Sequence, residues 1–155
     1  MENTYDFEIE NGILLKYWGC EENVIIPEGI TTIGRNAFAV CGSIRNVTIP
    51  GSVTEIGENA FGYCKNLKSI ILSDHLKSIK SHAFEFCESL IEIVIPEGVT
   101  VIGELAFREC NSLTDVVIPD SVKEIGKYAF SECKSLRNIT IPRGVAEIGD
   151  SVFSF

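Results

Sequence analysis

Residues 113–133 read LTDVVIPDSVKEIGKYAFSEC, and this stretch decides the fold. Its segment 116–119 is rich in β-branched residues and ends at Pro119, which cannot donate to a β-ladder, so a short strand is expected there. The residues Pro119, Asp120 and Ser121 are typical of a turn. In segment 127–133 the apolar residues are spaced as on one face of a short helix. The stretch therefore predicts a strand, a turn, a second short extended piece and a short helix.

The same pattern returns every 23 residues along the chain. Five full units cover residues 24–138, and a partial sixth unit follows. Several columns that stay in phase over this length indicate an internal repeat, which an amphipathic sequence alone does not produce. The most regular columns are Ile33, Ile56, Ile79, Ile102, Ile125 and Ile148; Phe38, Phe61, Phe84, Phe107, Phe130 and Phe153; and Cys41, Cys64, Cys87, Cys110 and Cys133.

A unit of 23 residues is too small to bury its own apolar face. Stacking the units on one another buries that face and produces a solenoid. Each coil then advances by one strand spacing, about 4.8 Å, and the strands form a parallel sheet. The sequence predicts a β-rich repeat solenoid with short helices, in which the repeated columns face inward and the variable positions face outward.

Residues 1–23 are interpreted as an N-terminal cap on a solenoid that covers residues 24–155, the two together forming one domain. Asn11 and Gly12 lie between apolar-rich segments, which is the strongest short signal for a β-hairpin. A two-residue loop places Ile9 opposite Leu14, so residues 5–19 are predicted to form a hairpin over the first coil. Terminal repeats need a polar outer face, and the acidic residues of this segment provide one.

The repeat resembles the BspA-type leucine-rich repeats of bacterial and protozoan proteins. The pattern Leu-x-x-Val-x-Ile-Pro-x-Ser-Val-x-x-Ile-Gly-x-x-Ala-Phe-x-x-Cys is followed by residues 67–87, 90–110 and 113–133. The resemblance covers about residues 24–153. It implies a right-handed, horseshoe-like or rod-like solenoid, often at a cell surface, that binds proteins or matrix and has no catalytic activity. The resemblance defines the fold better than the function.

The composition and net charge of the chain argue against some classes of binding partner. The chain has 155 residues, 22 acidic and 13 basic residues, and a formal net charge of -9, so nucleic acid and anionic membranes are poor partners. No apolar run approaches the length of about 18–20 residues that a membrane-spanning helix needs. The first residues are acidic and polar, unlike a signal peptide. A complete chain would therefore be cytoplasmic, whereas a fragment of a longer protein would fit the cell surface or secretion.

Five of the six cysteines fall in one column. Stacked thiols about 4.8 Å apart with parallel Cα–Cβ vectors suit neither a disulfide, whose Cβ atoms converge to about 3.8 Å, nor tetrahedral zinc. The column cysteines are therefore interpreted as small, buried apolar residues that stay reduced. Cys20 lies outside the column and is the candidate reactive thiol.

One unit departs from the pattern at several positions. It has Ser73 in the proline column and Lys80 in the glycine column, and it carries both histidines, His75 and His82. Sequence drift in a tolerant surface turn is one interpretation. The other is a local kink or a site, in which the histidines and Asp74 hold a metal. The sequence contains no catalytic grouping and no phosphate-binding loop, so no enzyme activity, cofactor or metal is predicted.

The outward positions of the main strand are the first candidate binding face. Its second row contains three adjacent apolar residues beside acidic neighbours, as interaction surfaces do. β-Propensity alone would also place Val, Ile and Thr there. The candidate residues are Asn46, Thr48, Ser69, Ile71, Glu92, Val94, Asp115, Val117, Asn138 and Thr140.

The flank of the expected helix offers a second candidate patch. Aromatic residues are enriched at interfaces, although lateral packing over the core is the favoured explanation, because the flank of an amphipathic turn is half-buried. The patch comprises Tyr63 and Phe86, which share a column with Val40, and His82, Leu105 and Tyr128 in the next column.

The last unit stops at Phe155 without a polar cap. Three outcomes are open: a longer native protein, a fold-back of Phe155 over the last coil, or a homodimer through the C-terminal ends. The leading hypothesis for function is a non-catalytic module that binds a protein, for example within a surface adhesin. The alternatives are a complete small intracellular repeat protein that self-associates or scaffolds, and a metal or thiol site at His75, His82 or Cys20.

Overall fold

The N-terminal hairpin forms at the predicted turn in the computed structural model, which describes residues 4–155; the first three residues of the predicted cap lie outside the described residues. Asn11 and Gly12 have φ angles of 50° and 76°, as a two-residue hairpin turn requires. After a short 3₁₀ helix, η1 (Thr4–Asp6), strand β1 (Phe7–Glu10) pairs antiparallel with β2 (Ile13–Tyr17). Ile9 lies opposite Leu14, as predicted.

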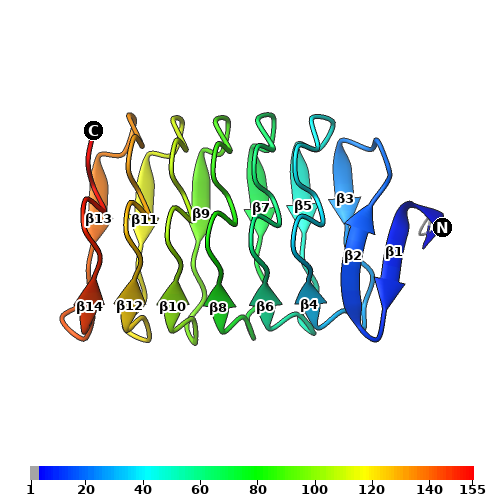
Figure 1. Ribbon diagram of the computed structural model, residues 1–155, viewed down its shortest axis with the longest axis horizontal. Helices are drawn as coiled ribbons and strands as arrows, with labels where there is room; N and C mark the ends of the chain where they lie inside the picture. Colours follow the sequence, from blue (N-terminus) through cyan, green and yellow to red (C-terminus); the bar gives the residue numbers. More distant parts are fainter. Residues whose placement is uncertain (1–3) are drawn as a thin grey trace.

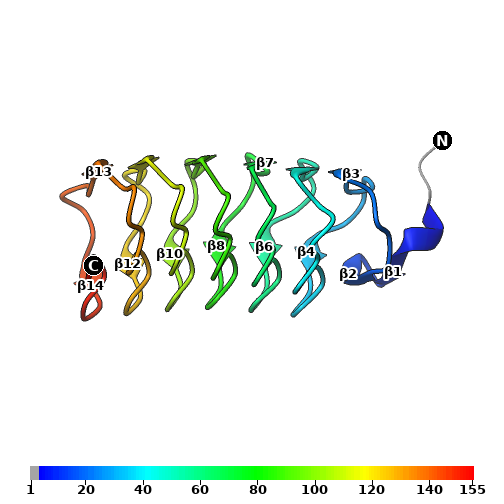
Figure 2. The same ribbon diagram turned by 90° about the horizontal axis from the view of Figure 1, so that it is seen from above.

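Each following coil contributes one three-residue and one two-residue strand, and the coils stack into a rod (Figures 1 and 2). The longer strands are β3 (Asn23–Ile25), β5 (Asn46–Thr48), β7 (Ser69–Ile71), β9 (Glu92–Val94), β11 (Asp115–Val117) and β13 (Asn138–Thr140). The shorter strands are β4 (Thr32–Ile33), β6 (Glu55–Ile56), β8 (Ser78–Ile79), β10 (Val101–Ile102), β12 (Glu124–Ile125) and β14 (Glu147–Ile148).

The strands form parallel ladders along the rod. The hairpin continues into the short strands as one sheet in the order β1-β2-β4-β6-β8-β10-β12-β14. The longer strands form two sheets, β3-β5-β7 and β9-β11-β13. From β3 onward, paired strands are in register with an offset of 23 residues, for example Val116 opposite Ile93, whereas Ile13 on β2 lies opposite Thr32 on β4. The predicted repeat solenoid with its hairpin cap is therefore confirmed.

The predicted short helices are wrong. In residues 57–64 the N–H groups of Ala60, Gly62 and Cys64 bond three residues back, to the carbonyls of Gly57, Asn59 and Phe61. The alternate N–H groups, of Asn59, Phe61 and Tyr63, bond instead to carbonyls of the next coil. An α-helix needs every N–H to bond four residues back along the same chain. The segment is therefore a series of turns, and the apolar spacing alone did not reveal this.

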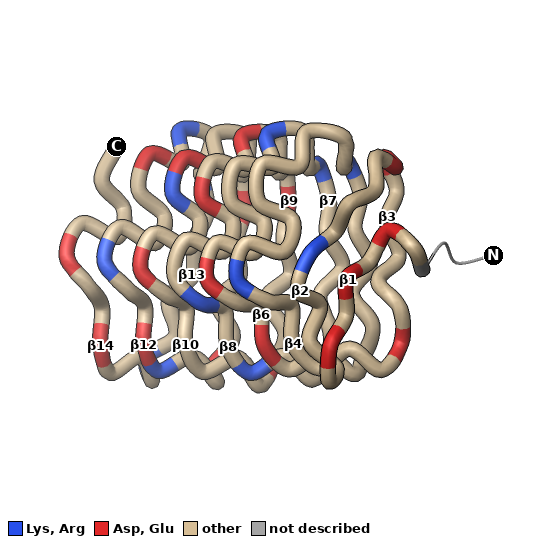
Figure 3. The backbone as a smooth tube through the Cα atoms, turned by 45° about the vertical axis from the view of Figure 1, so that its right-hand side comes forward, with Lys and Arg blue, Asp and Glu red and all other residues tan. Residues whose placement is uncertain are grey.

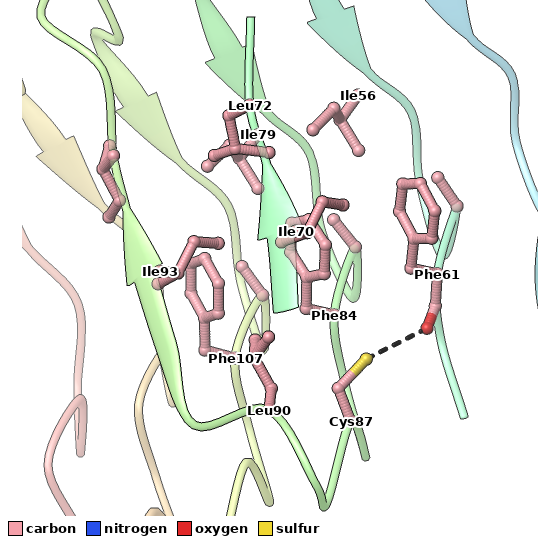
Figure 4. Packing of buried hydrophobic residues seen from close by; sticks show 14 of the residues in the cluster. Ile56, Phe61, Ile70, Leu72, Ile79, Phe84, Cys87, Leu90, Ile93 and Phe107 are labelled. Atoms are coloured by element: carbon pink, nitrogen blue, oxygen red, sulfur yellow. Dashed lines mark hydrogen bonds between the residues drawn. The ribbon is translucent and has the colours of Figure 1, made fainter. Parts of the chain in front are cut away.

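The core of the rod is a continuous stack of aromatic rings. The Phe38, Phe61, Phe84, Phe107, Phe130 and Phe153 rings stack with centroid separations of 4.8–6.0 Å. Figure 4 shows Phe61, Phe84 and Phe107 with inward isoleucines around them. Tyr17 and Phe7 of the hairpin extend the stack, because Tyr17 lies 5.0 Å from Phe38 and Phe7 lies 5.1 Å from Tyr17.

The column cysteines make a hydrogen bond besides filling space. The thiol of Cys87 donates to the carbonyl of Phe61 in the preceding coil at 3.2 Å (Figure 4). Cys64, Cys110 and Cys133 make the same bond to the Phe residue 26 positions earlier. All six cysteines are free, and these four are buried. The prediction of burial is wrong for Cys41, which is half-buried because the hairpin covers it less fully than a coil would.

Thiol labelling checks this arrangement. Burial raises the pKa of Cys64 and of Cys133 to about 12, and raises the pKa of Cys87 and Cys110 well above 9. The reactive thiolate is therefore absent from these residues at pH 8. We expect iodoacetamide to modify the exposed Cys20 first, Cys41 more slowly, and the four buried thiols only after unfolding. Peptide mass spectrometry would contradict this packing if any of the four reacted as fast as Cys20 in the native protein.

The last coil keeps its side chains largely in line with those of the preceding coils. Phe153 stacks on Phe130 at 6.0 Å, and Val152 is buried. Phe155 is 69% exposed, so it does not fold back over the coil. Pairing of two copies through this end stays a prediction.

Candidate interaction surfaces

The outward side of the longer strands, hereafter the strand face, carries a row of exposed apolar side chains. Strand alternation turns Ile70, Ile93 and Val116 into the core, where they are buried. It turns the adjacent Ile71, Val94 and Val117 outward, with exposed fractions of 64%, 79% and 70%. Val94 and Val117 are direct partners on β9 and β11. The strand face therefore presents an apolar stripe, with Val94 and Val117 on one sheet and Ile71 on the neighbouring sheet.

A polar row runs beside the apolar stripe. The amide of Asn46 donates to Asn23 at 2.7 Å, and Asn46 in turn accepts a hydrogen bond from the Ser69 hydroxyl at 2.8 Å. Asn138 donates to Asp115 at 2.8 Å, and this bond lowers the pKa of the Asp115 carboxyl. Glu92 lies directly opposite Asp115 on the neighbouring strand. The polar row is thus ordered at both ends and acidic in the middle.

The structure places all ten predicted strand-face residues on one side of the rod. Thr48 and Thr140 lie in the same row as the apolar stripe, at its two ends. Sequence reasoning missed two further exposed apolar residues, Ile25 on β3 and Ile91 immediately before β9. Ile25 lies 23 residues before Thr48, so extending the column by one unit would have found it. The repeat pattern did not indicate an exposed apolar residue at Ile91, because the other residues of its column are polar.

The second predicted patch, Tyr63, His82, Phe86, Leu105 and Tyr128, occupies the turn edge, by which we mean the edge formed by residues 35–41 and their repeats. All five residues have positive φ angles between 56° and 60°. The left-handed conformation is unfavourable for such residues. Tyr63 and Tyr128 are each 41% exposed, and the other three are half-buried. This repeated turn therefore holds bulky side chains at the surface.

A buried carboxylate organises part of the turn edge. Glu85 is almost fully buried and lies 3.1 Å from the guanidinium of Arg108 and 2.8 Å from Nδ1 of His82. The Arg108 guanidinium also lies 5.3 Å from the centre of the Phe86 ring, which stacks on Tyr63 at 4.7 Å. Sequence reasoning missed Glu85 and Arg108, because they are unusual only relative to the small residues of their column.

The two histidines are not brought together. His75 lies with Nδ1 2.9 Å from the carbonyl of Gly51, whereas His82 pairs with Glu85. Ser73, which replaces the proline of this column, also donates to Gly51. Residues 4–155 contain no group of three or more His, Cys, Asp or Glu side chains arranged to hold a metal ion. The unit that departs from the pattern coincides with the break between sheets β3-β5-β7 and β9-β11-β13.

Cys20 is exposed after the hairpin, as expected of a candidate reactive thiol. No helix in the described part of the chain is long and apolar enough to cross a membrane.

A stacked β-solenoid with 23-residue coils and an exposed strand face is the architecture of a leucine-rich repeat protein. The BspA-type leucine-rich repeat region matches residues 17–116 and 100–155 in six copies. The chain belongs to this family, as the repeat pattern predicted. No curated protein matches the chain.

Solved bacterial structures agree with this assignment. A leucine-rich repeat protein of T. pallidum is 35% identical, with a TM-score of 0.86 over 94% of this chain and 79% of that chain. A leucine-rich cell surface protein of Faecalibacterium prausnitzii is 35% identical, with a TM-score of 0.80 over 86% of this chain and 36% of that chain. A leucine-rich repeat protein of Bacteroides ovatus is 29% identical, with a TM-score of 0.69 over 96% of this chain and 48% of that chain. The chain thus spans about a third to a half of the last two proteins.

Proposed function

We propose that the chain is a non-catalytic module that binds a protein partner through the strand face. The observation that carries the proposal is the apolar stripe of Ile71, Val94 and Val117. Exposed apolar residues that lie together, rather than singly, mark sites of protein interaction. Val94 and Val117 are held by one sheet and Ile71 by the neighbouring one, so a partner meets a surface that loses little entropy on binding.

The acidic residues beside the stripe support the choice of this face. Glu92 and Asp115 form a polar rim on one side, and interfaces combine an apolar centre with a polar rim. The turn edge has exposed aromatic side chains, but Arg108 and Phe86 already contact neighbours within the chain. The side chains of Val94 and Val117 are largely exposed. The apolar side chains of the strand face are therefore more exposed to solvent than the aromatic side chains of the turn edge.

The location that we propose is the cell surface. The F. prausnitzii protein is a leucine-rich cell surface protein, and it is 35% identical to this chain. A repeat rod that presents one flat face suits adhesion to another protein. The partner itself is identified only by its chemistry, an apolar patch of matching size with a basic rim.

A paired-variant pull-down tests the proposal. We expect the double variant Ile71→Glu with Val94→Glu to lose a partner that the wild-type protein retains from an extract of the cells that make it. Two charges in the centre of the interface should reduce binding by at least about tenfold, because buried interfacial charges without a partner are costly. The control variant, Thr54→Glu, carries a charge on the opposite face. The same set of captured proteins for all three chains would contradict the assignment.

A further inference from the structure

The short-strand side of the rod, opposite the longer strands, has an open groove along the glycine column. Gly34, Gly57, Gly103, Gly126 and Gly149 occupy this column. The coils approach closely here: a Cβ atom at Gly57 would lie 2.7 Å from the carbonyl oxygen of Ile33, and one at Gly126 would clash with the backbone of Glu104. A side chain at these glycines would force the neighbouring coils to shift, and the glycines leave a furrow between two rows of residues that include Glu104, Glu124 and Glu147.

Lys80 divides this groove into two hollows. It is the one residue of the column that is not glycine in the coils between Gly34 and Gly149, and it lines both hollows. The hollow on its C-terminal side is open to solvent and has a volume of about 690 Å³ over Gly103, Gly126 and Gly149. The hollow on its N-terminal side encloses about 350 Å³ over Gly34 and Gly57. We call the larger hollow the glycine furrow.

The glycine furrow carries unbalanced negative charge. Its lining contains Glu104, Glu124 and Glu147, together with Lys80 and Lys127. Each lysine already has an acidic partner: Lys80 lies 3.5 Å from Glu55, and Lys127 lies 3.9 Å from Asp150. The three glutamate side chains have no ion-pair or hydrogen-bond partner among residues 4–155.

Two of these glutamates are placed against each other. Glu124 on β12 and Glu147 on β14 are direct partners of the parallel ladder, so their Cα atoms are about 4.8 Å apart. Figure 3 shows acidic positions on the neighbouring strands β12 and β14 at the C-terminal end of the rod. Like charges in this position destabilise a sheet. A cation bound in the furrow would relieve this repulsion.

We infer that the glycine furrow binds an extended basic segment of a protein partner. An extended chain follows a floor without side chains along the rod axis, and its arginine or lysine side chains reach the glutamates on the walls. Gly103 to Gly149 spans two coil steps, about 10 Å, or about three residues of extended chain. Apolar surface from Val101 and Ala146 on the same lining accommodates the aliphatic stems of such side chains. This site is separate from the strand face.

Charge-matched variants test the inference with defined peptides. The probes are the four-residue acetyl-(Arg-Gly)₂-amide and the eight-residue acetyl-(Arg-Gly)₄-amide, measured by fluorescence anisotropy at low salt. We expect Glu124→Gln with Glu147→Gln to weaken binding of both peptides at least about fivefold. The control, Glu28→Gln with Glu97→Gln, removes the same charge from exposed turns outside the furrow and should change binding less than about twofold. Equal losses from both pairs, or no binding to the wild-type protein, would overturn the inference.

Variants of Lys80 provide a second test, in which peptide binding is expected to become tighter instead of weaker. Lys80→Gly should join the two hollows, so the eight-residue peptide should bind at least about threefold more tightly than it binds Lys80→Gln, which removes the same charge and keeps the side chain. The four-residue peptide should bind the two variants equally. If the longer peptide also bound both variants equally, the furrow would not be its path. Circular dichroism checks that every variant is folded, and loss of partner binding in the strand-face variants leaves these results unaffected.

Discussion

Replacing Phe84 by alanine is expected to reduce the free energy of unfolding by about 3–5 kcal/mol. The Phe84 ring is fully buried and stacks on both neighbours, at 5.3 Å from Phe61 and 5.2 Å from Phe107. Removing it opens a cavity and breaks two aromatic contacts at once. The backbone turn cannot close the gap, because its N–H and carbonyl groups bond to the coils on either side. The melting temperature should fall by roughly 10 °C or more.

Phe153→Ala is the matched control. Its ring is half-buried and stacks on one neighbour only, Phe130, at 6.0 Å. We expect a loss of about 1–2 kcal/mol at this position, because less surface and fewer contacts are removed. Urea unfolding followed by circular dichroism measures both variants. Equal losses at Phe84 and Phe153 would mean that the ring column does not hold the coils together.

The repeat made most of the architecture predictable. Columns of Phe, Ile and Cys in strict phase can be satisfied only when identical positions of successive coils meet, so stacking and inward orientation follow from the spacing. The turn of Asn11 and Gly12 similarly fixed the hairpin and the pairing of Ile9 with Leu14. These features depend on local chemistry and on one period.

Other features depend on contacts between coils and carry little sequence signal. The turn edge was predicted as a helix, because Ala129, Phe130 and Cys133 have helical spacing, whereas the alternate N–H groups bond to the next coil. Tyr17 joins the aromatic stack although it lies 21 residues before Phe38, because β2 does not keep the 23-residue offset: Ile13 on β2 lies opposite Thr32 on β4. Extending the 23-residue period backward from Phe38 reaches Leu15, so the repeat pattern does not identify Tyr17.

Of the candidate surfaces, too, only the part that depends on local chemistry could be predicted from the sequence. The exposed row at Ile71, Val94 and Val117 followed from strand alternation. The Glu85–Arg108 pair and the glycine furrow did not, because each arises between coils from residues that are separated by a full repeat. Lys80 was visible as an exception in the glycine column, but its role as a divider depends on the shape of the groove.

Replacing Ile95 by glutamate is expected to unfold the protein. Ile95 is 4% exposed and faces the core directly after β9. A carboxylate there has no cation to pair with, so the substitution should cost at least about 4 kcal/mol from the buried charge and the lost apolar contacts. The neighbouring Val94, the last residue of β9, is exposed and points outward. Val94→Glu should change the free energy of unfolding by less than about 1 kcal/mol.

The most direct test of the account is therefore the thermal unfolding of Val94→Glu and Ile95→Glu side by side, followed by circular dichroism. The central claim is that the 23-residue repeat assigns one side of each longer strand to the core and leaves the other free for a partner. The account predicts a melting temperature within a few degrees of wild type for Val94→Glu, and no cooperative transition for Ile95→Glu. Comparable destabilisation by both substitutions would contradict it, because the strand face would then be part of the folded core.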